Sequence, residues 1–167
     1  MPELEQPSIT YEGDTGIRRP EVKICGLRDP DDVIHAATLG AEYLGMVIDF
    51  PPSPRNLSAH EAVELASVVR KINPDIADRL VGVFVDKPLA ELLEIVSDCG
   101  LRTVQLHGNE SPEYCAEVCS RGVKVWKAFR VGGESPESVI AGIEPYVDQV
   151  DQILLDAYSR QRSGGGL

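Results

Sequence analysis

Short apolar runs and longer segments of helical period alternate along the chain from about residue 21 onward. The apolar runs are rich in β-branched residues, as buried strands are, and each is followed by a longer segment with a helical repeat. Strands that alternate with helices in this way form parallel sheets with right-handed crossovers. The expected strands are VKICGL (22–27), YLGMVIDF (43–50), RLVGVFVD (79–86), RTVQLHG (102–108), VKVWKAFRV (123–131) and QILLDAY (152–158).

The segments between these strands carry helix start and stop signals. Asp29 can cap a helix with Pro30 at its first position, and Gly40 stands where that helix would end. Ser58 and Glu61 have the spacing of a capping box. The last two expected helices, 111–122 and 135–147, both open with Ser-Pro. The expected helical segments are 28–41, 57–72, 87–100, 111–122 and 135–147.

The first twenty residues differ from the rest of the chain. They are mostly polar, and they contain Gly13, Gly16 and Pro20. Their apolar residues follow neither the period of a helix nor that of a strand. We therefore expect residues 1–20 to be a flexible leader. Residues 21–167 are long enough to form one domain with a single core.

The first strand distinguishes two architectures for a parallel sheet. A doubly wound sheet would place a G-x-G-x-x-G turn after it, and CGLRDP is not one. A (β/α)8 barrel instead places polar side chains at the carboxyl ends of its strands, facing the interior. The period of two puts Lys23 and Cys25 on one face, while Val22 and Ile24 on the other are expected to pack on the helices.

Two further strands end in polar residues in the same manner. Gln105 and His107 alternate with apolar neighbours, and Asp156 follows two leucines. Taken singly, each has a plainer interpretation, such as a core cysteine for Cys25 or a turn histidine for His107. Together they favour a site inside a (β/α)8 barrel of which about six βα units are present.

Composition excludes several other classes of protein. The 27 acidic and 16 basic residues give a net charge of -11, which argues against binding to nucleic acid or to anionic membranes. The chain has no apolar run of about 20 residues and its start has no signal-peptide core, so we expect a cytoplasmic protein. Cys115 and Cys119 are spaced to share a helix face and could ligate a metal. No second pair accompanies them, so we expect small buried residues and no metal.

The motifs KICGL, PPSPRNLS, GVFVD, VQLHGNES, KAFRV and LLDAY, in this order, resemble phosphoribosylanthranilate isomerase over residues 22–163. The resemblance implies an enzyme of tryptophan biosynthesis. It would convert N-(5-phosphoribosyl)anthranilate, a small-molecule phosphosugar substrate, to 1-(2-carboxyphenylamino)-1-deoxyribulose 5-phosphate by an Amadori rearrangement without a cofactor. A related isomerase of histidine biosynthesis is the alternative, but there we would expect an aspartate in place of Cys25.

The resemblance also implies roles for two groups that transfer protons. Cys25 corresponds to the family's general base and Asp156 to its general acid. An ammonium group near a thiol favours the thiolate, so Lys23 is well placed to assist Cys25. The alternative for Lys23 is a structural pair with an acid inside the barrel. Asp156 must hold a proton at neutral pH, which requires burial or a nearby negative charge.

Other residues match positions that line the family's substrate site. Arg55 corresponds to an arginine near the anthranilate carboxylate, although an exposed loop arginine is the plainer interpretation. Gln105 and His107 match the family's QLHG motif and are expected to bind substrate. Asp86 and Arg130 are weaker candidates of the same kind.

The family barrel has eight strands, and only six are expected here. Its seventh and eighth strands carry loops that commonly bind the substrate phosphate, and SGGGL (163–167) resembles the start of a glycine-rich loop that follows the sixth strand. Open sheet edges predict instability, aggregation or a homodimer. The chain would then be part of a longer enzyme, an inactive remnant that associates through these edges, or one completed by another polypeptide.

Overall fold

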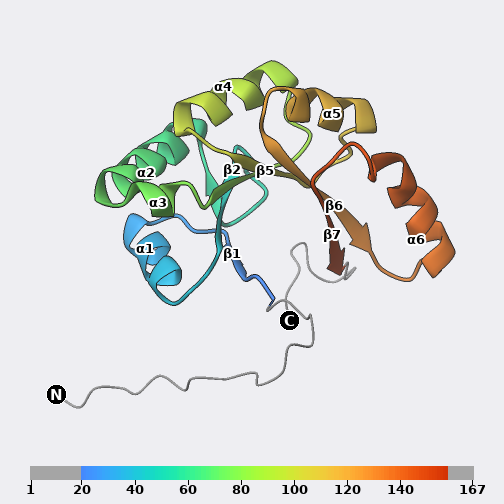
Figure 1. The fold of residues 1–167 in the computed structure, drawn as a ribbon, viewed down its shortest axis with the longest axis horizontal. Coiled ribbons are helices and arrows are strands. Elements are labelled where there is room, and N and C mark those ends of the chain that lie inside the picture. Colours follow the sequence, from blue (N-terminus) through green and yellow to red (C-terminus); the bar gives the residue numbers. More distant parts are fainter. Residues whose placement is uncertain (1–19, 158–167) are drawn as a thin grey trace, which may run out of the picture.

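The computed structural model describes residues 20–157 of the 167-residue chain. Its strands form one parallel sheet in the order β1-β2-β4-β5-β6-β7, and the short strand β3 pairs with β2 beside this path. The sheet curls so that the helices cover its outer face along an arc (Figure 1). The strands are β1 (Lys23–Cys25), β2 (Tyr43–Ile48), β3 (Asn56–Leu57), β4 (Leu80–Phe84), β5 (Thr103–Leu106), β6 (Lys124–Val131) and β7 (Gln152–Ala157).

The helices begin where the capping signals predict. Asp29 accepts a hydrogen bond from the Asp31 N–H, and Ser58 and Glu61 form both bonds of the capping box. The sequence did not predict β3 or the short helix α3, because such short elements have too few residues to show a period. The expected helical segment 135–147 consists of α6 followed by the 3₁₀ turn η1. The helices are α1 (Pro30–Thr38), α2 (Ala59–Ile72), α3 (Pro74–Ala77), α4 (Leu89–Cys99), α5 (Pro112–Ser120), α6 (Pro136–Ile143) and η1 (Glu144–Tyr146).

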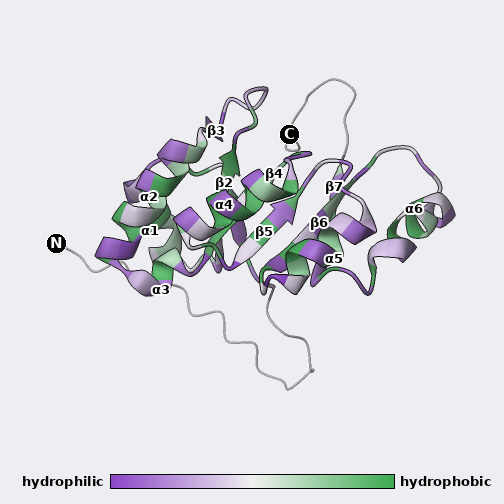
Figure 2. Ribbon diagram, turned by 90° about the horizontal axis from the view of Figure 1, so that it is seen from above, coloured by the Kyte–Doolittle hydropathy of each residue, from purple (hydrophilic) through white to green (hydrophobic). Residues whose placement is uncertain are grey.

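The hydrophobic core lies between the outer face of the sheet and the helices. Strand side chains such as Leu44, Phe84 and Leu106 meet helix side chains such as Val69 and Leu92, and all five are fully buried. Figure 2 shows apolar residues along β2, while the helices carry both apolar and polar residues. Each helix therefore buries one apolar side on the sheet, as amphipathic helices do.

Strands β1 and β7 form the two edges of the described sheet. Val22 and Ile24 are 48% and 42% exposed, so the prediction that they pack on the helices is wrong. The alternation itself is correct, because Lys23 and Cys25 lie on the opposite, inner face beside Gly45. The error arises because α1, the helix that follows β1, packs on β2. The period of a strand fixes the direction of its side chains but not what covers them.

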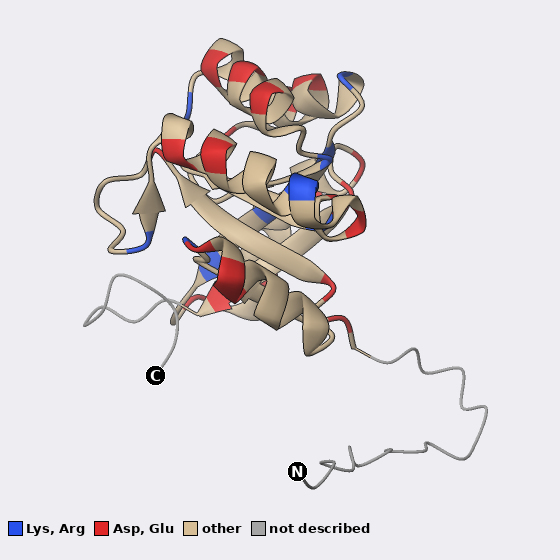
Figure 3. Ribbon diagram, turned by 90° about the vertical axis from the view of Figure 1, so that its left-hand side faces the viewer, with Lys and Arg blue, Asp and Glu red and all other residues tan. Residues whose placement is uncertain are grey.

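Charge and cysteines complete the description of the fold. Acidic residues gather on the outer helices, with few basic residues among them (Figure 3). Cys115 is fully buried in the core and Cys119, on the same helix, is half-buried. None of the helices between residues 20 and 157 is long and apolar enough to cross a membrane. The expected leader, apart from Pro20, and the glycine-rich segment 163–167 lie outside the described residues.

Candidate active site

The polar residues that end β1, β5 and β7 lie on the inner face of the sheet, toward the carboxyl ends of parallel strands. Lys23 and Cys25 come from β1, Gln105 from β5, His107 from the residue after β5, and Asp156 from β7. The structure brings four of them into one hydrogen-bonded chain. Because parallel strands share one carboxyl end, residues more than 130 positions apart in sequence meet there.

The hydrogen-bonded side chains connect β1, the first strand, to β7, the last. The Lys23 ammonium donates to Gln105 Oε1 at 2.7 Å, and Gln105 Nε2 lies 3.0 Å from His107 Nδ1. On the other side of the imidazole ring, His107 Nε2 lies 3.2 Å from Asp156 Oδ2. We call these four residues the polar chain. Among residues 20–157, Lys23 therefore bonds an amide and no acid, unlike its alternative interpretation.

Cys25 stands beside the polar chain, over a glycine of the neighbouring strand. Gly45 pairs with Cys25 in the β1–β2 register. A Cβ at Gly45 would lie 2.9 Å from Cys25 Sγ and 3.1 Å from Lys23 Nζ, so thiol and ammonium occupy the space above this glycine. Cys25 is exposed, which leaves its sulfur open to a ligand. Sequence reasoning missed Gly45, although a glycine within a strand is itself a signal of close approach.

Burial governs the charge of His107. The side chain is 22% exposed, and this burial lowers its pKa. The Asp156 carboxylate opposes the shift, whereas Arg130 and Lys127 add to it. Burial disfavours the imidazolium because the charged form loses hydration, so His107 is neutral near pH 7. Asp156 is 31% exposed, so its burial is only partial.

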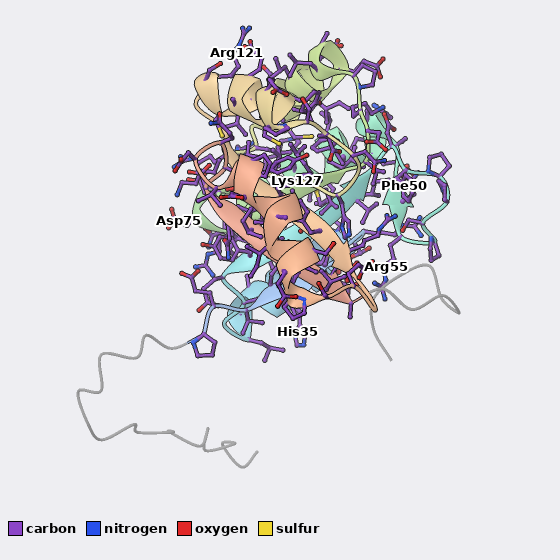
Figure 4. All side chains as sticks on the ribbon, turned by 90° about the vertical axis from the view of Figure 1, so that its right-hand side faces the viewer. His35, Phe50, Arg55, Asp75, Arg121 and Lys127 are labelled. Carbon is purple, nitrogen blue, oxygen red and sulfur yellow. The ribbon has the colours of Figure 1, made fainter. Side chains whose placement is uncertain are left out.

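Arg55 lies next to the residue that follows Cys25. Gly26 adopts a left-handed conformation with φ of 84°, and the stem of the Arg55 side chain packs against its open side. A side chain at Gly26 would collide with Arg55 Cδ. Arg55 itself is exposed on the loop between β2 and β3, where Figure 4 shows it away from the buried Lys127.

The two weaker candidates differ in their surroundings. Arg130 pairs with Asp156 in the β6–β7 register and is exposed, so it lies beside the acid end of the polar chain. Asp86 instead accepts from the backbone N–H of Asn109 at 2.5 Å and from its side-chain amide at 3.2 Å. Its carboxylate therefore braces the loop after His107.

A buried ion pair also holds the loop that follows His107. Lys127 and Glu110 are each 2% exposed, and their charged groups lie 3.1 Å apart. Glu110 also accepts from the backbone N–H groups of Asp86 and Gly108, while Lys127 donates to the Gly108 carbonyl at 2.8 Å. The sequence did not reveal this network, because its partners lie on different elements and form no local motif. It sets the path of the chain just after His107.

Two aromatic side chains stand in register with residues of the polar chain. Tyr43 is in register with Lys23, and Trp126 with Gln105. Their ring centroids are 4.5 Å apart and the rings are nearly perpendicular, at 79°. Edge-to-face contact of this kind is favourable. The inner face thus carries an aromatic pair beside the polar chain, and Trp126 is 5% exposed.

Other places in the described residues are less suited to chemistry. Between residues 20 and 157 there is no group of three or more His, Cys, Asp or Glu that could hold a metal ion. A cavity of about 510 Å³ lies beside α5, lined by Cys119, Lys124, Asp148, Asp151 and others. It opens at the amino ends of β6 and β7. In barrels of this type, residues at the amino ends of the strands contribute to stability, and the active site lies at the carboxyl ends.

Comparison with known proteins gives a consistent result. A family model described as N-(5'-phosphoribosyl)anthranilate (PRA) isomerase matches residues 22–167. The isomerase of Geobacter sp. strain M21 is 43% identical over 145 residues, covering 87% of this chain and 64% of the relative. That of Ralstonia nicotianae is 34% identical over 151 residues, covering 90% of this chain and 62% of the relative. The chain therefore spans less than two thirds of the length of these relatives.

Solved structures of isomerases share the fold. The phosphoribosylanthranilate isomerase of Thermotoga maritima superposes with a TM-score of 0.72 at 31% identity, covering 87% of this chain and 65% of the other. An isomerase in complex with reduced 1-(o-carboxyphenylamino)-1-deoxyribulose 5-phosphate gives a TM-score of 0.69 at 31% identity, covering 83% and 66%. The six parallel strands of the main sheet thus correspond to part of a (β/α)8 barrel, as the sequence predicts.

Proposed function

This chain belongs to the N-(5'-phosphoribosyl)anthranilate isomerase family, and from this premise we propose that it catalyses the isomerisation of N-(5-phosphoribosyl)anthranilate in tryptophan biosynthesis. The reaction is an Amadori rearrangement of an aldosylamine to an aminoketose. It requires an acid at the ring oxygen of the sugar and a base at C2. The proposed chemistry uses only side chains of the protein.

The two proton transfers are assigned to opposite edges of the sheet. Asp156 on β7 donates a proton to the furanose ring oxygen as the C1–O bond breaks, and the nitrogen lone pair forms the C1=N bond of a Schiff base. Cys25 on β1, as thiolate, then removes the proton from C2 and gives an enolamine, which tautomerises to the ketone. Acid and base both face the inner side of the sheet.

One observation carries this proposal. The polar chain joins β1, β5 and β7 by hydrogen bonds of 2.7 to 3.2 Å, and it puts the Lys23 ammonium beside the Cys25 thiol at one end and Asp156 at the other. A purely structural interior would place apolar side chains at these positions. The convergence of these polar groups from three strands supports a role in chemistry at this face.

Arg55 is proposed to bind the anthranilate carboxylate. The stem of its side chain packs on Gly26, the residue after Cys25, and Arg55 is exposed. A guanidinium fork matches a carboxylate with two parallel hydrogen bonds. Gln105 and His107 contact the sugar between the acid and the base. We place the protein in the cytoplasm, where its four free thiols would persist.

Turnover by the purified 167-residue chain tests the proposal. The substrate's anthranilate group is fluorescent, so conversion can be followed as a loss of fluorescence. We expect turnover that falls by about 10²- to 10⁴-fold in Cys25→Ala and in Asp156→Asn, the usual contribution of a general base or acid. Cys119→Ala, at the other end of the strands, should retain the rate. A folded chain without turnover would contradict the proposal.

A further inference from the structure

We infer that Gln105 is a positioning residue that sets the tautomer of His107, and thereby selects which oxygen of Asp156 carries the proton to be transferred. The inference deepens the proposed function and rests on it for the role of Asp156. It follows from assigning the donor and the acceptor of each hydrogen bond along the polar chain, starting at Lys23.

Lys23 fixes the orientation of the Gln105 amide. A lysine ammonium has three donors and no acceptor, so the Gln105 atom 2.7 Å from Nζ is the carbonyl oxygen. The reversed amide would bring two donors together at that distance. Gln105 is 6% exposed, so water has little access to compensate. The NH₂ group of Gln105 must therefore point toward His107.

The amide in turn fixes the imidazole. Gln105 Nε2 can only donate, and it lies 3.0 Å from His107 Nδ1. Nδ1 must then accept, so it carries no proton. The ring, neutral because burial lowers its pKa, carries its hydrogen on Nε2. That N–H faces Asp156 Oδ2 at 3.2 Å and donates to it.

The last step concerns Asp156. Because Oδ2 accepts the hydrogen bond from His107, Oδ1 is the oxygen left to carry the proton that the proposed mechanism transfers. When Oδ1 gives this proton to the sugar ring oxygen, negative charge develops on the carboxylate, and the His107 N–H already points at it. A preoriented donor stabilises developing charge without reorganisation. The opposite tautomer would present a lone pair to the carboxylate and would remove this stabilisation.

The nitrogen chemical shifts of the imidazole report the tautomer directly. The chain has three histidines, and His35 and His60 lie on the exterior helices α1 and α2. A long-range ¹H–¹⁵N spectrum of the ¹⁵N-labelled full chain, assigned with His107→Gln, should show His107 with a protonated Nε2 and an unprotonated Nδ1. Protonation at Nδ1 in the wild-type chain would overturn the inference.

Gln105→Glu provides the decisive variant. It keeps the shape of Gln105 and its bond from Lys23, but its carboxylate can only accept. We expect Nδ1 of His107 to become protonated and kcat to fall at least tenfold. Gln149→Glu, which adds the same charge in the segment before β7, should leave the tautomer and kcat unchanged. An unaltered His107 spectrum in folded Gln105→Glu would refute the role of Gln105.

The spectroscopic result does not depend on turnover. A chain with the expected tautomer but without activity would contradict the proposed function and leave the positioning role of Gln105 intact. A chain that turns over substrate with Nδ1 protonated would overturn the positioning role and leave the isomerase proposal intact. The two failures are thus separable.

Discussion

Gly45, on the inner face of the sheet, leaves little space for a side chain. A Cβ there would lie within 3.2 Å of Cys25 Sγ, Lys23 Nζ and the Cys25 Cα, closer than side chains normally pack. We expect Gly45→Ala to destabilise the fold by about 1–3 kcal/mol, as overpacking does, and to change the rate at which a thiol reagent modifies Cys25. Urea denaturation and labelling kinetics measure both effects.

Gly142 provides the matched control for that substitution. It lies in α6, is exposed, and would meet nothing within 4 Å if it carried a Cβ. Gly142→Ala should therefore stabilise the protein by about 0.5–1 kcal/mol, because alanine is the better helix former. Equal effects of the two substitutions would contradict the close approach at Gly45.

His107 predicts a pH dependence of stability. Burial, reinforced by Arg130 and Lys127 and opposed by Asp156, lowers its folded-state pKa below the usual 6.5. As pH falls through about 6.5, the unfolded chain gains a proton here that the folded chain does not, so the free energy of unfolding decreases until the folded pKa is passed. His107→Gln should lose less stability between pH 7.5 and 5.5 in urea denaturation. Parallel losses in both proteins would contradict this.

At the residue scale, the strand period placed the polar groups correctly. Lys23, Cys25 and Gln105 face the interior as alternation predicts, because side-chain direction in a strand is local. What Lys23 bonds was not predictable, since its partner stands 82 positions away. The catalytic roles of Cys25 and Asp156 remain predictions that the proposed turnover assay addresses.

At the scale of elements, the buried ion pair of Lys127 and Glu110 ties β6 to the loop after β5. Lys127→Met would leave Glu110 buried without its partner, and we expect a loss of about 3–5 kcal/mol in the free energy of unfolding. The exposed pair of Arg121 and Glu117 on α5 is the control, and Arg121→Met should cost less than about 1 kcal/mol. Similar losses for both would contradict the structural role of the buried pair.

Helices were predicted better than the connections between them. Asp29, Ser58, Ser111 and Ser135 cap α1, α2, α5 and α6 as their positions indicate, because a cap depends on neighbouring residues only. Strand β3 instead exists because the loop after β2 returns to pair with β2. Such pairing depends on the folded sheet and leaves no local pattern.

At the scale of the whole molecule, the described sheet has two unpaired edges. Ile24 on β1 is 42% exposed and Leu155 on β7 is 61% exposed, and Figure 1 shows the arc of the sheet open between these strands. Unpaired, apolar edges favour pairing with another chain. We propose that two copies of the 167-residue chain associate through them.

Sedimentation velocity tests this association. The wild-type chain should form dimers as its concentration rises, and Leu155→Lys should shift it toward monomer, because a charge on an edge strand opposes pairing. Leu39→Lys, on a leucine at the end of α1 that is 73% exposed, should leave the dimer unchanged. A wild-type chain that stays monomeric at all concentrations would contradict the edge association.

We propose that the carboxyl ends of β1, β5 and β7 form one site for the phosphosugar substrate. The most direct measurement is a titration of the ¹⁵N-labelled chain with reduced 1-(o-carboxyphenylamino)-1-deoxyribulose 5-phosphate, followed by amide chemical shifts. The account predicts changes at Cys25, Gly26, His107 and Asp156. Changes confined to Cys119 and Asp151 at the opposite cavity, or no changes at all, would contradict it.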